Sequence, residues 1–289
     1  MGRANRTLQK KYTIIKFLTM KRLFLILITL FCHLVIQANN PDSLALKTIR
    51  VKLHYLNREP FFFSTENKFQ GIEKEIIDQF ADWARTRKNT HLVFEYVAHP
   101  DFNSLILKCK EEKDAFLGSG TVTIKDERSK FFHFSPPYLK NISILISHPG
   151  AGRLDGKNLK AAAVKNSVHQ SHLNELIQTR GLQAESILIE NQLQLPDLIH
   201  SDSTVIGYMD LLNYWSFVNQ HPDKHLKIHR SASRDHEAFG FICKQQSELA
   251  ELLDAFFSAG FGFTATRKYD AILKKYLGNE VMSAVEVNE

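Results

Sequence analysis

A glycine-rich stretch followed by an arginine is the feature of this sequence best suited to bind a charged group. Residues 118–123 read Gly-Ser-Gly-Thr-Val-Thr, and Arg128 follows five residues later. A buried strand is expected at residues 115–117, which places the two threonines and several N–H groups at a strand's carboxyl end. Arginine binds a carboxylate through two parallel N–H bonds, and hydroxyl and N–H donors fill the remaining lone pairs. We therefore predict that Arg128, Thr121 and Thr123 bind a carboxylate, the alternative being that Arg128 is an ordinary surface residue.

Other motifs that could carry chemistry are incomplete. Residues 118–123 lack the third glycine of the dinucleotide-binding pattern GxGxxG, and no long helix is predicted directly after them. The sequence has no GxSxG, HExxH or phosphate-binding loop. His221, His225 and His229 are spaced by four, which on a helix would align three imidazoles as metal ligands, but Pro222 disfavours a helix there. We therefore expect no cofactor and no bound metal.

Phe61 begins a run of three phenylalanines directly after Pro60. Such a run usually packs in a core, but a ring at a strand's carboxyl end can also line a pocket. Phe61 is therefore included among the candidate ligand-binding residues.

The net charge of +6 does not indicate a nucleic-acid partner, because of where the charge lies. Of the 37 basic and 31 acidic residues in the chain, residues 1–38 hold seven basic and no acidic ones. This leaves 30 basic against 31 acidic residues in the remainder. Binding to phosphates needs lysine and arginine fixed on a folded surface, so we expect no nucleic-acid partner.

The N-terminal segment has the pattern of a secretory signal peptide. Lys21 and Arg22 precede an apolar run at residues 23–36, and Ala38 comes before a polar stretch. The run is shorter than the roughly 20 apolar residues that span a bilayer as a helix. We predict a start-site extension at residues 1–19, a signal peptide at 20–38 cleaved after Ala38, and export from the cytoplasm.

Strands and helices are expected to alternate along the rest of the chain. Residues 48–55 alternate apolar and polar, which is typical of a strand, and the spacing of apolar residues after Gly71 predicts an amphipathic helix. Further strands are expected at 92–97, 115–117, 161–164, 186–189, 204–208 and 238–243, and helices at 102–110, 171–179, 195–200, 248–259 and 267–277. This order predicts an α/β protein of two lobes, each a mostly parallel sheet flanked by helices, with the ligand cleft between the lobes.

The predicted lobes are discontinuous in the sequence. Residues 46–140 together with 242–278 form the first lobe, residues 141–241 form the second, and residues 279–289 form a C-terminal tail. The sequence has no proline- or serine-rich linker, so strands near residues 139–143 and 239–243 are expected to connect the lobes and act as a hinge. Two cysteines, Cys109 and Cys243, follow the leader; they could form a disulfide in an oxidising compartment or remain buried thiols.

Four short motifs follow one another along the chain. They are Glu59-Pro60-Phe61-Phe62-Phe63; Gly-Ile-Glu-Lys-Glu at residues 71–75; residues 123–128 with Phe-Ser-Pro-Pro-Tyr at 134–138; and Lys-Lys-Tyr-Leu-Gly at 274–278. In this order they resemble the family 3 solute-binding proteins of ABC importers, the periplasmic receptors for polar amino acids. The third motif is similar to the family's most specific signature, Thr-x-Thr-x-x-Arg followed by Phe-Ser-x-Pro-Tyr. The resemblance covers roughly residues 48–278.

The resemblance assigns roles to individual residues. It implies that Arg128 binds the ligand's α-carboxylate with help from Thr121 and Thr123. It also implies that Ser167 adds N–H and hydroxyl donors from the second lobe, and that Asp210 binds the ligand's α-amino group. A zwitterionic ligand needs a cation and an anion on opposite walls of its site, and each interaction is strongest where closure excludes water.

Three classes of function follow from the resemblance. The first is a monomeric solute-binding protein that captures a small zwitterion, such as a polar amino acid, for an ABC permease in the inner membrane. The second is a sensor or regulatory domain of the same fold. The third is an enzyme similar to cyclohexadienyl dehydratase, which would need a general acid such as Glu59 or Glu237 over the ligand. The expectation is a binding protein and not an enzyme.

Overall fold

The computed structural model describes residues 46–66, 68–151, 154 and 158–286. Both sheets described below lie in one compact unit, which begins at Thr48. The predicted start-site extension and signal peptide lie outside the described residues. Within the part of the chain that is described, no helix is both long and apolar enough to cross a membrane.

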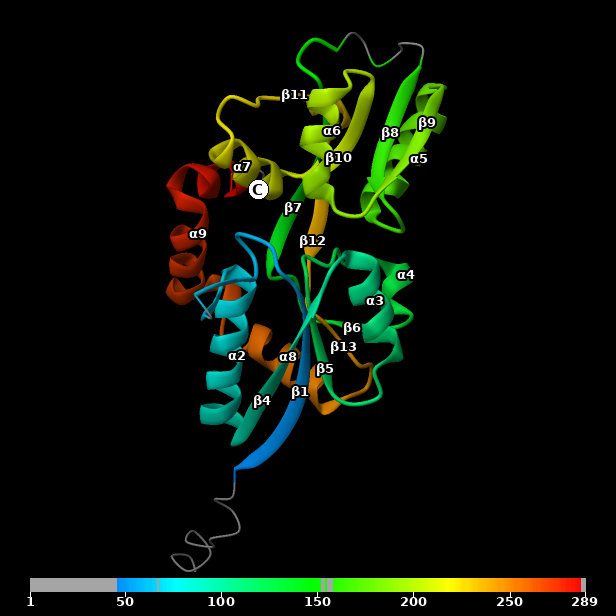
Figure 1. Ribbon diagram of the computed structural model, residues 1–289. Helices are drawn as coiled ribbons and strands as arrows, with labels where there is room; N and C mark the ends of the chain where they lie inside the picture. Colours follow the sequence, from blue (N-terminus) through cyan, green and yellow to red (C-terminus); the bar gives the residue numbers. More distant parts are fainter. Residues whose placement is uncertain (1–45, 67, 152–153, 155–157, 287–289) are drawn as a thin grey trace, which may run out of the picture. The chain divides into compact units, whose positions relative to one another are not determined.

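A five-stranded sheet forms the first lobe (Figure 1). Its strands, in spatial order, are β4 (Thr90–His99), β1 (Lys47–Leu56), β5 (Phe116–Ser119), β13 (Ile242–Cys243) and β6 (His133–Phe134). β1 and β5 are parallel, and β13 is antiparallel to both of its neighbours. The helices of this lobe are α2 (Ile72–Lys88), α3 (Phe102–Glu111), α4 (Asp126–Ser129), α8 (Glu248–Ser258) and α9 (Arg267–Glu286), with a short 3-10 helix η4 (Phe263–Ala265).

The predicted alternation in the first strand is confirmed and explains how helices cover both faces of the sheet. Val51, Leu53 and Tyr55 of β1 are buried in one cluster with residues of α2, α8 and α9, and Ile49 packs against it. Leu56 lies in a second cluster with residues of α3. Because successive side chains of a strand point to opposite faces, one strand supplies both cores.

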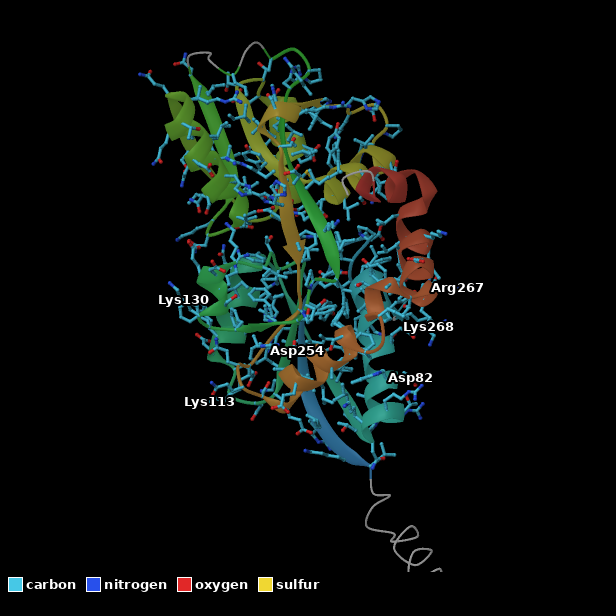
Figure 2. The ribbon with its side chains drawn as sticks, turned by 180° about the vertical axis from the view of Figure 1, so that it is seen from behind. Asp82, Lys113, Lys130, Asp254, Arg267 and Lys268 are labelled. Carbon is cyan, nitrogen blue, oxygen red and sulfur yellow. The ribbon has the colours of Figure 1, made fainter. Side chains whose placement is uncertain are left out.

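Helices α2 and α9 also contact each other at their surface. Lys268 at the start of α9 donates a hydrogen bond to Gln79 of α2 at 3.0 Å, and Asp82 lies further along α2 (Figure 2).

A second sheet forms the second lobe. Its strands, in spatial order, are β11 (Lys227–Ile228), β7 (Leu139–Ser147), β10 (Val205–Asp210), β8 (Leu159–Val164) and β9 (Ala184–Ile189), with β12 (Arg234–Phe239) also paired to β7. The helices are α5 (Val168–Arg180), α6 (Leu195–Ser201) and α7 (Leu211–Gln220), with the 3-10 helices η2 (Gln192–Gln194) and η3 (Arg230–Ala232). β8, β9 and β10 are parallel, as predicted, but β7 pairs antiparallel with three neighbours.

The two lobes are joined by two strands that run side by side. β7 leaves the first lobe after Tyr138, and β12 returns to it, with Leu139 paired to Phe239. The strand predicted at residues 238–243 is therefore two strands in different sheets: β12 ends at Phe239, and β13 begins at Ile242. These crossovers lie at the positions predicted for a hinge, and hinge motion itself remains a prediction.

Other elements differ from the sequence-based expectation. A hairpin of β2 (Phe63–Thr65) and β3 (Lys68–Gln70) and the helix α7 were not predicted. The backbone of α9 continues to Glu286 past a non-helical Gly278, so part of the predicted tail is helical. Cys109 and Cys243 are both buried free thiols, so the alternative of a disulfide does not apply.

Candidate ligand-binding site

A cavity lies between residues of the first and second lobes. It holds about 420 Å³ of space unfilled by atoms, part of which is open to solvent. The first lobe lines it with Arg58, Phe102, Thr121, Thr123 and Arg128, and the second with Val164, Ser167, Val168, His169, Glu190, Gln192 and Asp210. The lining combines apolar side chains with a few charged and polar groups, as small-molecule sites do. A wider hollow next to it shares Phe102, Arg128, Ser167 and Val168.

The predicted carboxylate-binding residues come together on the first-lobe wall. Thr121 and Thr123 follow β5 and are buried, and Arg128 lies on the short helix α4. Arg128 Nη1 donates to the carbonyl oxygen of Thr123 at 2.9 Å, and its Cζ is 5.0 Å from the centre of the Phe102 ring. Burial lowers the pKa of Arg128 to about 10, so the guanidinium remains charged at neutral pH. The contacts to Thr123 and Phe102 hold the cation at the cavity while several of its N–H groups stay available.

Glu73, in the first turn of α2, fixes the backbone that carries Thr121. Its carboxylate is buried and accepts hydrogen bonds from Ser119 Oγ at 2.7 Å, from the Thr121 N–H at 2.9 Å and from the hydroxyl of Tyr138. Burial raises the pKa of Glu73, although these hydrogen bonds oppose the shift. Thr121 has a positive φ of 50°, an uncommon conformation for a residue with a side chain. The Glu73 contact therefore stabilises a strained residue of the binding site.

Arg58 is a second cation in the cavity, and the sequence analysis did not select it. It follows the carboxyl end of β1, and its Nη1 donates to Thr121 Oγ1 at 3.3 Å. Burial lowers the pKa of Arg58, and the negative charges of Asp210 and Glu73 partly offset this. The available signal was its position, because a charged residue just beyond a strand's carboxyl end in an α/β lobe lies where ligands bind.

The start of helix α5 forms part of the second-lobe wall. Ser167 is the N-cap residue: its hydroxyl accepts from the Gln170 N–H at 3.2 Å and donates to the Val164 carbonyl at 2.6 Å. Val168 and His169, in the first turn, line the cavity too. The N-terminal turn of a helix offers N–H groups and a positive partial charge, which favour an anion. Ser167 therefore lines the cavity from the second lobe, and its role in binding a ligand stays a prediction.

Asp210 also lines the cavity, as predicted, but its carboxylate already accepts four hydrogen bonds. Oδ1 accepts from Asn141 Nδ2 at 2.7 Å and from His169 Nε2 at 3.2 Å. Oδ2 accepts from Gln192 Nε2 at 2.7 Å and from Asn213 Nδ2 at 3.1 Å. Burial alone would raise the pKa of Asp210, but the contacts with His169, Gln192 and Asn141 outweigh it and lower the pKa to about 2. Asp210 is therefore ionised, and its hydrogen bonds hold the polar side chains of the second-lobe wall in place.

Comparisons with known proteins agree with this arrangement. Residues 52–279 match the sequence profile of the bacterial extracellular solute-binding proteins, family 3. The chain belongs to this family. No curated protein matches the chain in sequence. Among solved structures, an ancestral arginine-binding protein bound to arginine has 21% identity and a TM-score of 0.60, covering 81% of this chain and 100% of its own.

Two further structures show the same solute-binding fold with different ligands in their names. The arginine-, lysine-, histidine-binding protein ArtJ from Geobacillus stearothermophilus has 18% identity and a TM-score of 0.63, covering 82% of this chain and 99% of its own. The GluR0 ligand-binding core from Nostoc punctiforme in complex with L-glutamate has 15% identity and a TM-score of 0.61, covering 79% and 99%. At these identities the likeness supports the two-lobed fold and leaves the ligand of this solute-binding protein open.

Phe61 is the candidate site residue whose predicted place the structure contradicts. Its ring is 1% exposed and packs in the core of the first lobe, 6.0 Å from the centre of the Phe239 ring. It does not appear among the described residues that line the cavity. The physical reason is a tight turn of the chain after β1, in which the N–H and the carbonyl of Arg58 both pair with Phe62. The turn directs the Phe61 ring into the core, and Arg58 lines the cavity instead.

The three histidines spaced by four do not share a helix in this solute-binding protein. α7 ends at Gln220, and His221 is its C-cap residue. His225 lies in the loop before β11, and His229 precedes η3. Pro222 sits directly after the end of α7, as expected for a residue that cannot continue a helix.

Proposed function

We propose that this protein captures a small carboxylate-bearing ligand, of the amino-acid class, in the cavity between its lobes. The observation that supports this most is Arg128. Its guanidinium lines the cavity beside the hydroxyl groups of Thr121 and Thr123, and across from the helix α5 N-terminus at Ser167. No ion pair joins the guanidinium to a carboxylate among the described residues. A ligand carboxylate would supply the missing anion and accept from the guanidinium fork.

We propose further that the protein acts outside the cytoplasm, in the periplasm after removal of residues 20–38, and delivers its ligand to an ABC permease as a monomer. Membership of an extracellular solute-binding family supports the compartment. A sensor domain of the same fold would bind its ligand in the same way, and differs in what it contacts afterwards. Ligand-dependent transport by a co-expressed permease would separate the two.

An enzymatic role similar to a cyclohexadienyl dehydratase has less support. Its general acid would have to reach the ligand, and neither Glu59 nor Glu237 is among the described residues that line the cavity. Burial alone would raise the pKa of Glu237, but hydrogen bonds from His172 and from Ser143, the latter at 2.7 Å, hold it below its usual value. A general acid at neutral pH needs a raised pKa, so Glu237 is poorly placed for that role.

A thermal-unfolding screen tests the proposed function. The full set of amino acids and small mono- and dicarboxylates would be added to the protein one at a time. A ligand at about 100 times its Kd stabilises the native state by about 2.7 kcal/mol, which raises the Tm by several degrees for a domain of this size. We expect a shift with at least one compound and none in Arg128→Ala. No shift with any compound would reject the proposal.

A further inference from the structure

Asp210 has no capacity left for a ligand's amino group. A carboxylate has about four acceptor positions, and the Asp210 oxygens use them for Asn141, His169, Gln192 and Asn213. Because Asp210 accepts only, the contact requires the hydrogen of His169 to be on Nε2. Asn213 is itself buried, so a ligand ammonium that replaced it at Asp210 would leave its amide NH2 group unpaired, whereas Asn141 would keep its contact with Glu237.

The opposite is true of the two arginines. Arg58 donates one hydrogen bond, to Thr121 Oγ1 at 3.3 Å, and Arg128 donates one, to the Thr123 carbonyl at 2.9 Å. No ion pair involves either guanidinium among the residues that the structure describes. Both guanidinium groups are half-buried and line one cavity, and each has five N–H donors. Burial disfavours both cations, and the negative charges nearby offset this only in part, so an anion that enters the cavity would stabilise them.

We propose that the ligand of this cavity carries two acidic groups, one bound by Arg128 and the other by Arg58. The inference rests on the proposed function, which it narrows from any amino acid or carboxylate to dicarboxylic ligands, with or without an amine. Arg128 binds the first carboxylate with the donors of Thr123 and Ser167. Arg58, at the end of β1, then selects the second acid, and Asp210 serves to hold the polar side chains of the second-lobe wall in place.

The charges in the cavity argue against a basic ligand such as those named for two of the structural neighbours. A basic side chain of the ligand would lie beside the like charges of Arg58 and Arg128. The buried carboxylate of the cavity, Asp210, already has its acceptor positions occupied and could not bind it. The other acid that lines the cavity, Glu190, is exposed to solvent and so offers a screened interaction. A neutral amide at the second position would leave the Arg58 guanidinium without an anion.

Two matched pairs of ligands test the proposal in calorimetry on the whole chain. L-Glutamate against L-glutamine and L-aspartate against L-asparagine each differ only in the second acidic group. In whichever pair contains the ligand of highest affinity, we expect the acid to bind at least tenfold more tightly than its amide. Glutarate or succinate, which lack the amine, should bind within about tenfold of the corresponding amino acid, and L-arginine should not compete.

Substitution of Arg58 assigns the effect to this residue. Arg58→Gln should weaken binding of the acid at least tenfold and change binding of the amide by less than about threefold, and Arg58→Lys should fall between the wild type and Arg58→Gln. Arg85→Gln, on the exposed side of α2, is the control and should change nothing.

The outcomes separate the inference from the proposed function. Equal or tighter binding of an amide, or tight binding of arginine, would overturn the inference and leave the proposed function standing. If no compound of the screen binds, both fail. The ligand preference of the wild-type protein decides the question even if the Arg58 variants do not fold.

Discussion

Asn141 and Asp210 join the two central strands of the second lobe through one short hydrogen bond: Asn141 Nδ2 lies 2.7 Å from Asp210 Oδ1. The same amide also lies 3.2 Å from Glu237 Oε2, so one side chain of β7 links the acids of β10 and β12. All three side chains are at most partly accessible, and β7 and β12 are the crossovers between lobes. The polar wall of the cavity is therefore connected to the predicted hinge.

Asp210→Asn should destabilise the fold. The amide has a single oxygen, so two of the four donors would face an NH2 group, and we expect a loss of about 2–4 kcal/mol in the free energy of unfolding at pH 7. Because the folded-state pKa of Asp210 is about 2, below its ordinary 3.8, this stabilisation is present above about pH 4 and is lost as the pH falls through about 2. Chemical denaturation at pH 7 and pH 2.5 should show the difference between variant and wild type narrowing. Glu190→Gln is the control, and an equal loss in it would contradict the account of Asp210.

Glu73→Gln should reduce both stability and ligand affinity. An amide cannot accept from Ser119, Thr121 and Tyr138 together, so at least one buried donor loses its partner, at a cost of about 1–3 kcal/mol. Thr121 should then leave its strained conformation, which weakens ligand binding. Denaturation and calorimetry measure the two effects.

Glu75→Gln is the matched control for Glu73→Gln. Glu75 lies in the same turn of α2 but accepts from Lys275 and Tyr276, and not from Thr121. It should keep wild-type affinity. Lost stability with unchanged affinity in Glu73→Gln would show that Thr121 does not depend on Glu73.

Gly71→Ala should disturb the start of α2 and the turn that carries Arg58. Gly71 has φ of 120°, and a Cβ there would lie 2.2 Å from the carbonyl oxygen of Phe61. We expect a loss of about 3 kcal/mol or more in the free energy of unfolding. Gly181→Ala is the control: Gly181 has φ of 62° with no atom within 4 Å of the added Cβ, so it should lose only about 1 kcal/mol. Similar losses of stability in the two variants would mean that the positive φ, and not the steric clash with the Phe61 carbonyl oxygen, determines the loss.

The pair of His54 and His99 should make the fold less stable in mild acid. His54 Nδ1 is 2.8 Å from His99 Nε2, and His54 Nε2 is buried without a hydrogen-bond partner. Burial lowers the pKa of both rings below 6.5, with the nearby Glu112 opposing the shift at His54. The unfolded state therefore binds more protons, and stability falls as the pH drops below about 6.5.

Denaturation from pH 7.5 to 5.5 measures the contribution of this pair. His54→Gln should flatten the dependence of stability on pH, whereas His91→Gln, an exposed histidine on β4, should not. An unchanged slope in His54→Gln would contradict the predicted linkage.

The sequence predicted those strands and helices whose apolar residues recur at a regular local spacing. The alternation around Val51 and the helical spacing after Gly71 each reflect one element with one buried face, and both are confirmed. Helix α7 was missed because it begins at Leu211, directly after β10 with no loop between them, and its N-cap residue, Asp210, is also the last residue of the strand. The switch of sheets between β12 and β13 was missed because a continuous apolar run does not show which sheet it pairs with.

The candidate site was predictable where its residues are neighbours in sequence. Thr121, Thr123 and Arg128 share one segment, so their spacing was readable as a carboxylate site. Arg58 reaches the cavity from a different segment, which only the packing of β1 beside β5 brings close. The role of Asp210 likewise depends on four donors from separate elements. A sequence motif predicts where such residues stand in the chain, but not which side chains they contact in the fold.

The central claim, that Arg128 binds the carboxylate of a small ligand in the cavity, is tested most directly by calorimetry on Arg128→Lys with the best ligand of the screen. Lysine keeps the charge but loses the bidentate fork, so we predict a loss of about 2 kcal/mol or more in binding free energy with unfolding nearly unchanged. Arg85→Lys is the control. Wild-type affinity in Arg128→Lys would contradict the claim.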